Sequence, residues 1–474
     1  MRLLSILLVV FSISLTAAVN DNPDVKGAER LFEAWMRGQL SSRGLPGVAV
    51  GVVHNQELVW ARGFGYADVE NKVPMTPKTK FRMASHSKLF TATSIMQLQE
   101  AGKIRLDDPV SKYLPWFQIK PAEPEDPPIT IEELLTHSSG LPREAGSHWS
   151  DYKFPDADGL KKFIKENDVT YSPEVRWKYS NLAFSIAGQI VEALSGQAWA
   201  AYIQANIFDP LGMQSSSVDK NVEGLTKGYG RRKPDGTRDL MPFVDARAMG
   251  AATGITSNVE DMAKFVGLQF RKGKSGGSQI LSTGSLREMH RVRVLENNWT
   301  RGNAIGFAVS RERDKVYIGH GGGYPGNMTQ TLIQLDDQVG VIVLTNSADG
   351  APADIASQLM QTVGEAVAKA GATPPQPIRW DPSWSRFSGL YRSGGFGETE
   401  VVELNRRLVM ITPYGPTATT QIRLTPLGDG RFRAESPVGG SAVGEVVRFE
   451  ESGGKVTRMY FGGSFSERVA TVAQ

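Results

Sequence analysis

The order of hydrophobic and polar residues along the chain predicts strands near both ends of a first domain and helices between them. Residues 45–68 read as two strands around a tight turn at 54–56, and further strands are expected between residues 304 and 346. Helices are expected at residues 29–40 and 352–371. We therefore expect an α/β (α+β) domain in which both ends build one antiparallel sheet, flanked by helices, with a helical region inserted.

A Pro-rich stretch separates this domain from a region of different composition. Beyond residue 383, short apolar runs alternate with Gly, Asp and Pro turns, without helical spacing. We expect a linker at 373–383 and a small all-β domain, either a barrel or a sandwich, at 384–474.

The first residues have the pattern of a targeting segment. An apolar run from Leu3 to about Leu15 follows one positive charge, and small residues stand at Ala17 and Ala18. This pattern predicts a secretory signal peptide at 1–18, a first domain at 19–372 and a secreted or periplasmic protein. An uncleaved membrane anchor is the alternative, although the run is short for a span and no later stretch is apolar for long enough.

Composition and charge exclude several classes of function. The chain has no cysteine, which excludes thiol nucleophiles, disulfides and thiolate metal sites. Its net charge of +3 comes without any Lys/Arg-rich block, so no nucleic-acid partner is expected. His54, His86, His148 and His290 show no metal-ligand spacing, and we expect no metal and no cofactor. The sequence gives no indication of an oligomeric state.

Candidate chemistry begins at Ser85 and Lys88. Residues 89–98 are apolar on nearly every side, which predicts a buried helix, and residues three apart on a helix share a face. Lys88 then lies against the core, where an ammonium is costly unless it is paired or its pKa falls. Taken alone, this S-x-x-K spacing is explained more simply by a snorkelling lysine near a helix start.

Two further stretches carry residues suited to the same site. Tyr179-Ser180-Asn181 precedes an apolar helix, for which Ser180 or Asn181 would also serve as an ordinary cap. A strand leads into His320 and the glycines 321–323, which indicates either a turn or a strand edge that a substrate approaches closely.

Taken in order, S-x-x-K, Y-x-N and H-G-G resemble the serine β-lactamase and penicillin-binding-protein family, in particular its class C branch. The resemblance covers roughly residues 25 to 370 and includes connecting stretches such as LDDPVSKYLP and GITSNVEDMAKF. It implies a β-lactamase/transpeptidase-like fold and a serine hydrolase without a cofactor. Because that branch includes D-aminopeptidases, D-alanyl-D-alanine carboxypeptidases and esterases, the implied substrate is a small ester, amide or peptide.

The resemblance assigns the catalytic roles. Ser85 is the expected nucleophile, since a serine hydroxyl needs a base to take its proton. Lys88 and Tyr179 are the expected proton partners, and the sequence leaves open which of them is the formal base. His320 completes the expected catalytic set.

The remaining residues are expected to hold the substrate. Asn181 would bind Lys88 and the acyl side chain, and Gly321 and Gly322 would let an extended substrate approach the strand. The backbone N–H groups of Ser85 and Gly323 would form the oxyanion hole. His137 is expected to shape a loop beside the cleft without a chemical role.

His320 departs from a common family pattern. Many β-lactamases and carboxypeptidases have a lysine there, which helps bind the substrate carboxylate, whereas histidine is mostly neutral at pH 7. H-G-G therefore resembles the D-aminopeptidase and esterase-like members. The leading hypothesis is a secreted hydrolase of small esters or D-amino-acid peptide bonds. The alternatives are a β-lactamase or carboxypeptidase, a penicillin-recognising sensor without turnover, and an idle scaffold, which the intact motifs disfavour.

Overall fold

The computed structural model describes residues 19–218, 222–273, 277–372, 379–394, 397–411, 421–436 and 439–469. The predicted signal peptide and part of the predicted linker lie outside these residues. Contacts divide the chain into two compact units, Met1–Ala372 and Thr373–Gln474. Among the described residues, no helix combines the length and the apolar character that a membrane span requires.

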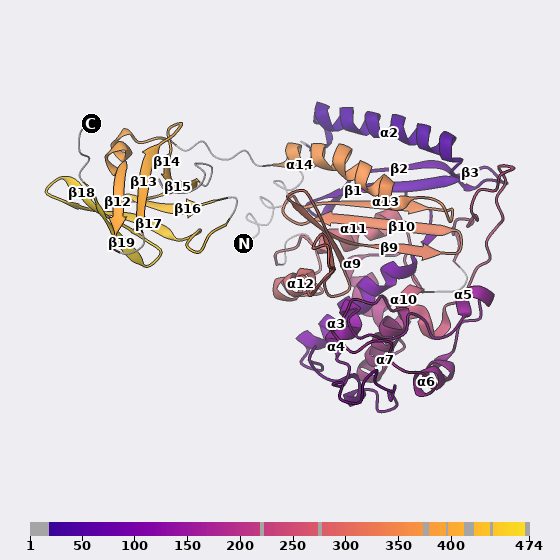
Figure 1. Ribbon diagram of the computed structural model, residues 1–474. Helices are drawn as coiled ribbons and strands as arrows, with labels where there is room; N and C mark the ends of the chain where they lie inside the picture. Colours follow the sequence, from indigo (N-terminus) through magenta and orange to yellow (C-terminus); the bar gives the residue numbers. More distant parts are fainter. Residues whose placement is uncertain are drawn as a thin grey trace, which may run out of the picture. The chain divides into compact units, whose positions relative to one another are not determined.

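A nine-stranded antiparallel sheet runs through the first unit (Figure 1). In spatial order its strands are β3 (Val73–Pro74), β2 (Glu57–Asp68), β1 (Gly47–His54), β11 (Val339–Thr345), β10 (Asn327–Gln334), β9 (Lys315–Tyr324), β8 (Ala308–Glu312), β7 (Arg301–Asn303) and β6 (Val294–Leu295). The two ends of the unit meet where β1 pairs with β11, with Val48 opposite Thr345. The predicted fold class, with one sheet built from both ends, is confirmed.

Both faces of the sheet are buried, because successive side chains of a strand point to opposite faces. Val48 and Val50 of β1 belong to one hydrophobic core, and Ala49 and Val53 belong to another. The first core lies under α2 (Pro23–Arg43), α13 (Pro352–Leu359) and α14 (Glu365–Gly371), which cover one face of the sheet (Figure 1). A π-helical segment, Met360–Gly364, joins α13 to α14.

The other face carries the helical region and a short two-stranded sheet, β4 (Phe81–Arg82) with β5 (Thr256–Ser257). Its helices are α3 (Ser87–Glu100), α4 (Ile131–Thr136), α5 (His148–Asp151), α6 (Ala157–Glu166), α7 (Asn181–Ser195), α8 (Trp199–Ile203), α9 (Asp209–Leu211), α10 (Gly250–Thr253), α11 (Val259–Leu268) and α12 (Thr283–His290). Helix α3 packs against α7, α10 and α8, and Ser87–Met96 and Leu98 of this helix are buried on all its sides.

The described residues of the second unit form a closed barrel of eight antiparallel strands. After a 3-10 helix at Pro382–Phe387, its strands are β12 (Gly389–Ser393), β13 (Gly397–Glu403), β14 (Leu408–Ile411), β15 (Ile422–Gly428), β16 (Arg431–Glu435), β17 (Val446–Ser452), β18 (Lys455–Phe461) and β19 (Ser464–Arg468). The barrel has its own core, in which Phe387 stacks on Phe449 with ring centroids 4.3 Å apart. Of the two all-β forms expected from the sequence, the structure is the barrel.

Candidate active site

Ser85 lies in a 3-10 turn, Ala84–His86, that leads directly into α3. Ala84 has φ +49°, a left-handed conformation that is costly for a residue with a side chain. The turn is held from both sides, because Met83 N donates to Ile255 O at 2.8 Å and His86 is fully buried. The two ring nitrogens of His86 lie 3.0 and 3.2 Å from the hydroxyls of Thr329 and Thr331 on β10.

Lys88 is completely buried, and its Nζ lies 3.1 Å from Ser85 Oγ. Two further oxygens are within hydrogen-bond distance of Nζ, namely Asn181 Oδ1 at 2.6 Å and Ala252 O at 3.0 Å. Burial holds the pKa of Lys88 well below its usual value, because removal from water disfavours the ammonium. A neutral amine would donate one hydrogen to each of the two carbonyl oxygens and keep its lone pair for Ser85.

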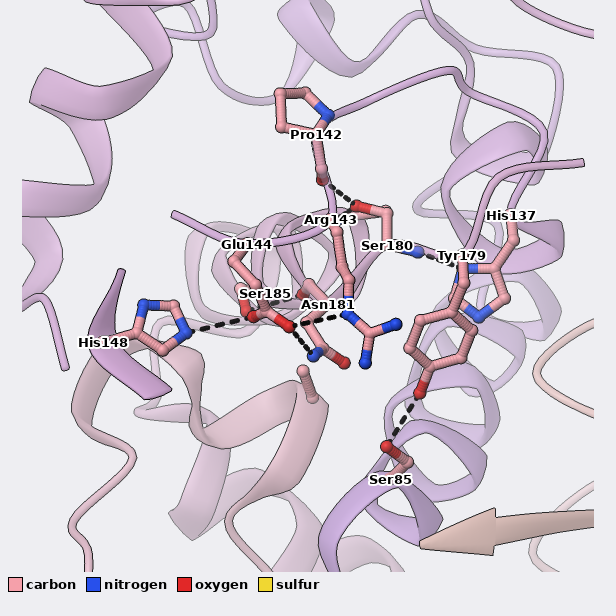
Figure 2. Close-up of polar contacts among 12 residues, drawn as sticks. Ser85, His137, Pro142, Arg143, Glu144, His148, Tyr179, Ser180, Asn181 and Ser185 are labelled. Carbon is pink, nitrogen blue, oxygen red and sulfur yellow. Dashed lines mark hydrogen bonds and ion pairs between the residues drawn. The ribbon is translucent and has the colours of Figure 1, made fainter. Parts of the chain in front are cut away.

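The Tyr179 hydroxyl donates to Ser85 Oγ at 2.7 Å (Figure 2). Burial raises the pKa of Tyr179 to about 12, so the phenol is protonated at neutral pH. The ring of His137 packs against that of Tyr179 with centroids 4.3 Å apart, and its Nδ1 accepts from Ser180 N at 3.1 Å. His137 adopts a left-handed φ of +60° at the end of α4, which aims its ring at the Tyr179 segment. The loop that His137 is predicted to shape is therefore the segment that carries Tyr179 and Ser180.

Asn181 is the first residue of α7 and is almost fully buried. Ser180 caps the helix, since its Oγ accepts from Ala183 N at 2.9 Å and donates to Pro142 O at 2.7 Å. The side-chain amide of Asn181 therefore points into the site, with Oδ1 toward Lys88 and Nδ2 toward Glu144 Oε1 at 2.6 Å.

The predicted H-G-G segment is part of strand β9, so its glycines do not form a turn. Pairing with β8 ends at Gly319, whereas pairing with β10 continues to Tyr324. From residue 320 onward, one edge of β9 therefore has no neighbouring strand in the described sheet. His320 is buried, and burial lowers its pKa to about 4, with the nearby Lys88 as a second cause. His320 is therefore neutral at pH 7.

A cavity of about 630 Å³ joins these residues, a size suited to a small organic substrate. Its lining consists of Ser85, Arg143, Trp149, Tyr152, Trp177, Tyr179, Asn181, Thr253, His320, Gly321, Gly323, Tyr324, Pro325 and Met328. Aromatic rings make up much of the wall, and among the described lining residues Arg143 is the one with a permanent charge. No described carboxylate lines this cavity.

The structure brings most of the predicted site residues together and separates one of them. Ser85, Tyr179, Asn181, His320, Gly321 and Gly323 line the cavity, and Lys88 contacts Ser85 from beneath. Gly322 does not line the cavity, because a side chain at this position would point into the protein interior. A Cβ there would lie 2.3 Å from Thr329 Oγ1 and 2.4 Å from Met83 O. The need for glycine at position 322 therefore comes from packing under the Ser85 turn.

Sequence reasoning missed Glu144 and His148. Glu144 Oε2 lies 3.0 Å from His148 Nε2, and its Oε1 accepts from Asn181 and from Arg143 Nε at 3.3 Å (Figure 2). The one available signal is the position of Glu144 two residues after Pro142, at the end of the Gly-Leu-Pro turn that follows the α4 segment. That signal does not indicate that the turn folds back onto the start of α7.

Comparisons with known proteins agree with this geometry. The sequence model of the beta-lactamase family matches residues 32–364 of the 474. The chain belongs to the beta-lactamase family. The resemblance predicted from the three motifs is confirmed at the level of this family.

Relatives of this beta-lactamase family member include two proteins of Bacillus subtilis. PbpX, a penicillin-binding protein by name, is 34% identical over 227 residues, which are 48% of this chain and 55% of the relative. Penicillin-binding protein 4* is 25% identical over 312 residues, or 62% and 66% of the two chains. The protein flp of Staphylococcus aureus is 29% identical over 195 residues, or 41% and 39%. The chain thus spans about half the length of the curated relatives it matches.

Solved structures share the fold. The octameric penicillin-binding protein homologue from Pyrococcus abyssi has a TM-score of 0.62 at 24% identity, covering 92% of this chain and 98% of that one. A D-stereospecific amidohydrolase from Streptomyces has a TM-score of 0.59 at 21% identity, covering 71% and 98%. At these identities the likeness is one of fold.

Proposed function

We propose that this member of the beta-lactamase family is a serine hydrolase that forms an acyl-enzyme on Ser85. The observation that carries the proposal is the contact of Ser85 Oγ with Lys88 Nζ at 3.1 Å and with the Tyr179 hydroxyl at 2.7 Å, beside a cavity of about 630 Å³. A nucleophile, a proton acceptor and a proton donor thus meet where a substrate fits.

The pKa directions favour Lys88 as the formal base. Burial lowers the pKa of Lys88 and raises that of Tyr179 to about 12, so the amine is deprotonated at a lower pH than the phenol. Neutral Lys88 would take the Ser85 proton as Oγ attacks the substrate carbonyl carbon. The Tyr179 hydroxyl would then deliver a proton to the leaving group and be reprotonated from Lys88. The amides of Ser85 and Gly323 remain the proposed oxyanion donors.

The cavity favours an uncharged ester or amide with an apolar acyl group, because the permanent charge among its described lining residues, on Arg143, is paired with Glu144 at 3.3 Å. Trp149, Trp177 and Tyr324 offer apolar surface, and the described lining has no carboxylate to bind a free amino group. His320 is neutral where a permanent charge would attract a substrate carboxylate. We therefore propose esters or neutral D-amino-acid amides as the substrate class, ahead of β-lactams. The signal peptide predicted at 1–18 supports an exported enzyme.

A substrate panel tests this proposal. Wild type and Ser85→Ala are compared on p-nitrophenyl esters, on D-amino-acid anilides with free and with acetylated amino groups, and on a chromogenic cephalosporin. We expect neutral esters to be turned over fastest and acetylated anilides better than free ones. Ser85→Ala should lose nearly all turnover, since loss of the nucleophile costs about 10⁶-fold in another serine hydrolase. Fastest turnover of the cephalosporin would contradict the proposed substrate class.

A further inference from the structure

We propose that Glu144 is a positioning residue that acts on Lys88 through the side chain of Asn181. This inference rests on the proposed function, because it concerns how Lys88 is kept ready to accept the Ser85 proton. The two ends of the Asn181 amide face different partners: Oδ1 lies 2.6 Å from Lys88 Nζ, and Nδ2 lies 2.6 Å from Glu144 Oε1.

The carboxylate of Glu144 fixes which end of the amide faces Lys88. An ionised carboxylate only accepts hydrogen bonds, so it pairs with the NH₂ group of Asn181 and would repel the carbonyl oxygen. Burial raises the pKa of Glu144, but hydrogen bonds from His148 and Asn181 outweigh burial and hold that pKa below its usual value. Glu144 is therefore ionised at neutral pH, and Asn181 Oδ1 is turned toward Lys88.

The orientation of Asn181 decides what the lone pair of Lys88 can do. With Oδ1 facing it, neutral Lys88 donates to Asn181 Oδ1 and Ala252 O, and its lone pair stays available to Ser85. With the amide reversed, the NH₂ group would donate to that lone pair and compete with the Ser85 proton. By holding the Asn181 amide in this orientation, Glu144 keeps the lone pair of Lys88 available to accept the Ser85 proton.

Glu144 is itself held in place from several directions. Its side chain is 13% exposed, and its Oε2 lies 3.0 Å from Nε2 of the buried His148, whose ring packs on Phe154 at 4.2 Å. The preceding backbone is fixed to α7, because Arg143 O accepts from Asn181 N at 2.8 Å and Leu182 N at 3.2 Å. Figure 2 shows Glu144 between His148 and Asn181.

Charge gives the same residue a second effect on Lys88. Glu144 raises the pKa of Lys88 against the dominant effect of burial, and Arg143 lowers it. The other titratable groups around Lys88 are His86, His137, His320 and Tyr179, and the shifts in their pKa values make all four neutral at pH 7. Among the described residues near Lys88, Glu144 and Arg143 are thus the charged groups that act on it.

The test is the pH dependence of kcat/KM for a neutral ester, on which Arg143 has no substrate charge to bind. Glu144→Gln should move the acid limb to lower pH, because the anion that favours protonated Lys88 is gone. Arg143→Gln should move the limb to higher pH. Glu192→Gln is the matched control, since its half-buried carboxylate on the far end of α7 accepts from Gln189 and Trp199 N away from Lys88. This control should keep the wild-type profile.

Glu144→Ala removes both the charge and the acceptor for Asn181. We expect it to lower the plateau of kcat/KM by about tenfold or more, part of the 10²–10⁴ that a positioned base contributes. Unmoved profiles in both Glu144 variants, or a shift of Glu144→Gln in the same direction as Arg143→Gln, would overturn the inference. If Glu144→Ala does not fold, the pH profiles of Glu144→Gln and Arg143→Gln test the inference.

Labelling of Ser85 by a fluorophosphonate, measured on the same samples, separates this inference from the proposed function. A wild type that is not labelled at Ser85 would contradict the function itself. Labelling of Ser85 with unmoved profiles would contradict only the role of Glu144.

Discussion

At the scale of single residues, burial decides which groups around Ser85 carry charge. Lys88, His320 and His86 lose affinity for protons when they are removed from water, and Tyr179 holds its proton more tightly. The result is a neutral base, a neutral phenol and neutral imidazoles around the nucleophile. With Arg143 paired to Glu144, such a site favours reactions of neutral substrates.

His320 provides a test of this account through pH. An unperturbed histidine would gain charge near pH 6.5, but the pKa of His320 is lowered to about 4. We therefore expect the ratio of penicillin acylation to ester turnover to stay flat from pH 8 to about pH 5.5. Taking the ratio cancels the protonation of Lys88, which affects both substrates. A ratio that rises as the pH falls through 6.5 would mean that His320 titrates as if exposed.

The sequence predicted the residues that belong to motifs and missed those that depend on tertiary folding. The spacing of Ser85 and Lys88 fixes their common helical face, and Asn181 follows from the Y-x-N motif. Glu144 and His148 belong to no periodic pattern, and they reach the site because the segment after α4, which leads to His148 at the start of α5, folds back onto the start of α7. Such a contact, between Glu144 and Asn181, 37 positions apart, has no local signature.

At the scale of elements, the junction between β9 and the Ser85 turn is packed too tightly for any side chain at position 322. Gly322→Ala would place a Cβ 2.4 Å from Met83 O, a backbone atom that cannot move without shifting the turn. We expect a loss of about 1–3 kcal/mol in the free energy of unfolding, together with reduced turnover. Urea unfolding followed by circular dichroism measures the loss.

Gly323→Ala is the matched control for that substitution. The nearest atom to its new Cβ is Met328 Sδ at 3.5 Å, an ordinary contact distance. Its stability should stay near that of wild type, while turnover falls because the methyl group enters the cavity. Equal stability losses in the two variants would show that packing under Ser85 is not what requires Gly322.

The sequence predicts which segments form strands better than it predicts where a strand ends or how a helix begins. Apolar runs identified β1 and β11 because both faces of the sheet are buried. The continuation of β9 through its glycines was left open, since glycine in a strand gives no apolar signal. The 3-10 turn at Ala84–His86, ahead of α3, depends on the left-handed conformation of Ala84, which sequence does not indicate.

At the scale of the whole molecule, the histidines are distributed unevenly between the two units. All six precede residue 372, and the barrel has none. The pKa values of His86 and His320 are lowered to about 3 and about 4. As the pH falls, these two histidines are therefore protonated in the unfolded chain at a higher pH than in the folded protein. Their contribution to stability is complete above pH 6.5 and is lost as the pH falls from there toward about 4 for His320 and about 3 for His86.

Calorimetry should therefore show two transitions with different pH dependence. Between pH 7.5 and pH 5, each of these two histidines should cost the first unit roughly 2 kcal/mol. Its transition temperature should fall, while that of the barrel stays nearly constant and serves as an internal control. Equal shifts of both transitions would contradict the assignment of acid sensitivity to buried histidines.

The most direct test of the central claim is to map covalent labelling by mass spectrometry after reaction with a fluorophosphonate. Ser87→Ala is the control, because the Ser87 hydroxyl is buried between Ala84 O at 2.7 Å and Ile255 N at 3.0 Å, away from the cavity. We predict one label per chain, on the peptide that contains Ser85, absent in Ser85→Ala and present in folded Ser87→Ala. A label on any other serine, or one that survives Ser85→Ala, would contradict the account.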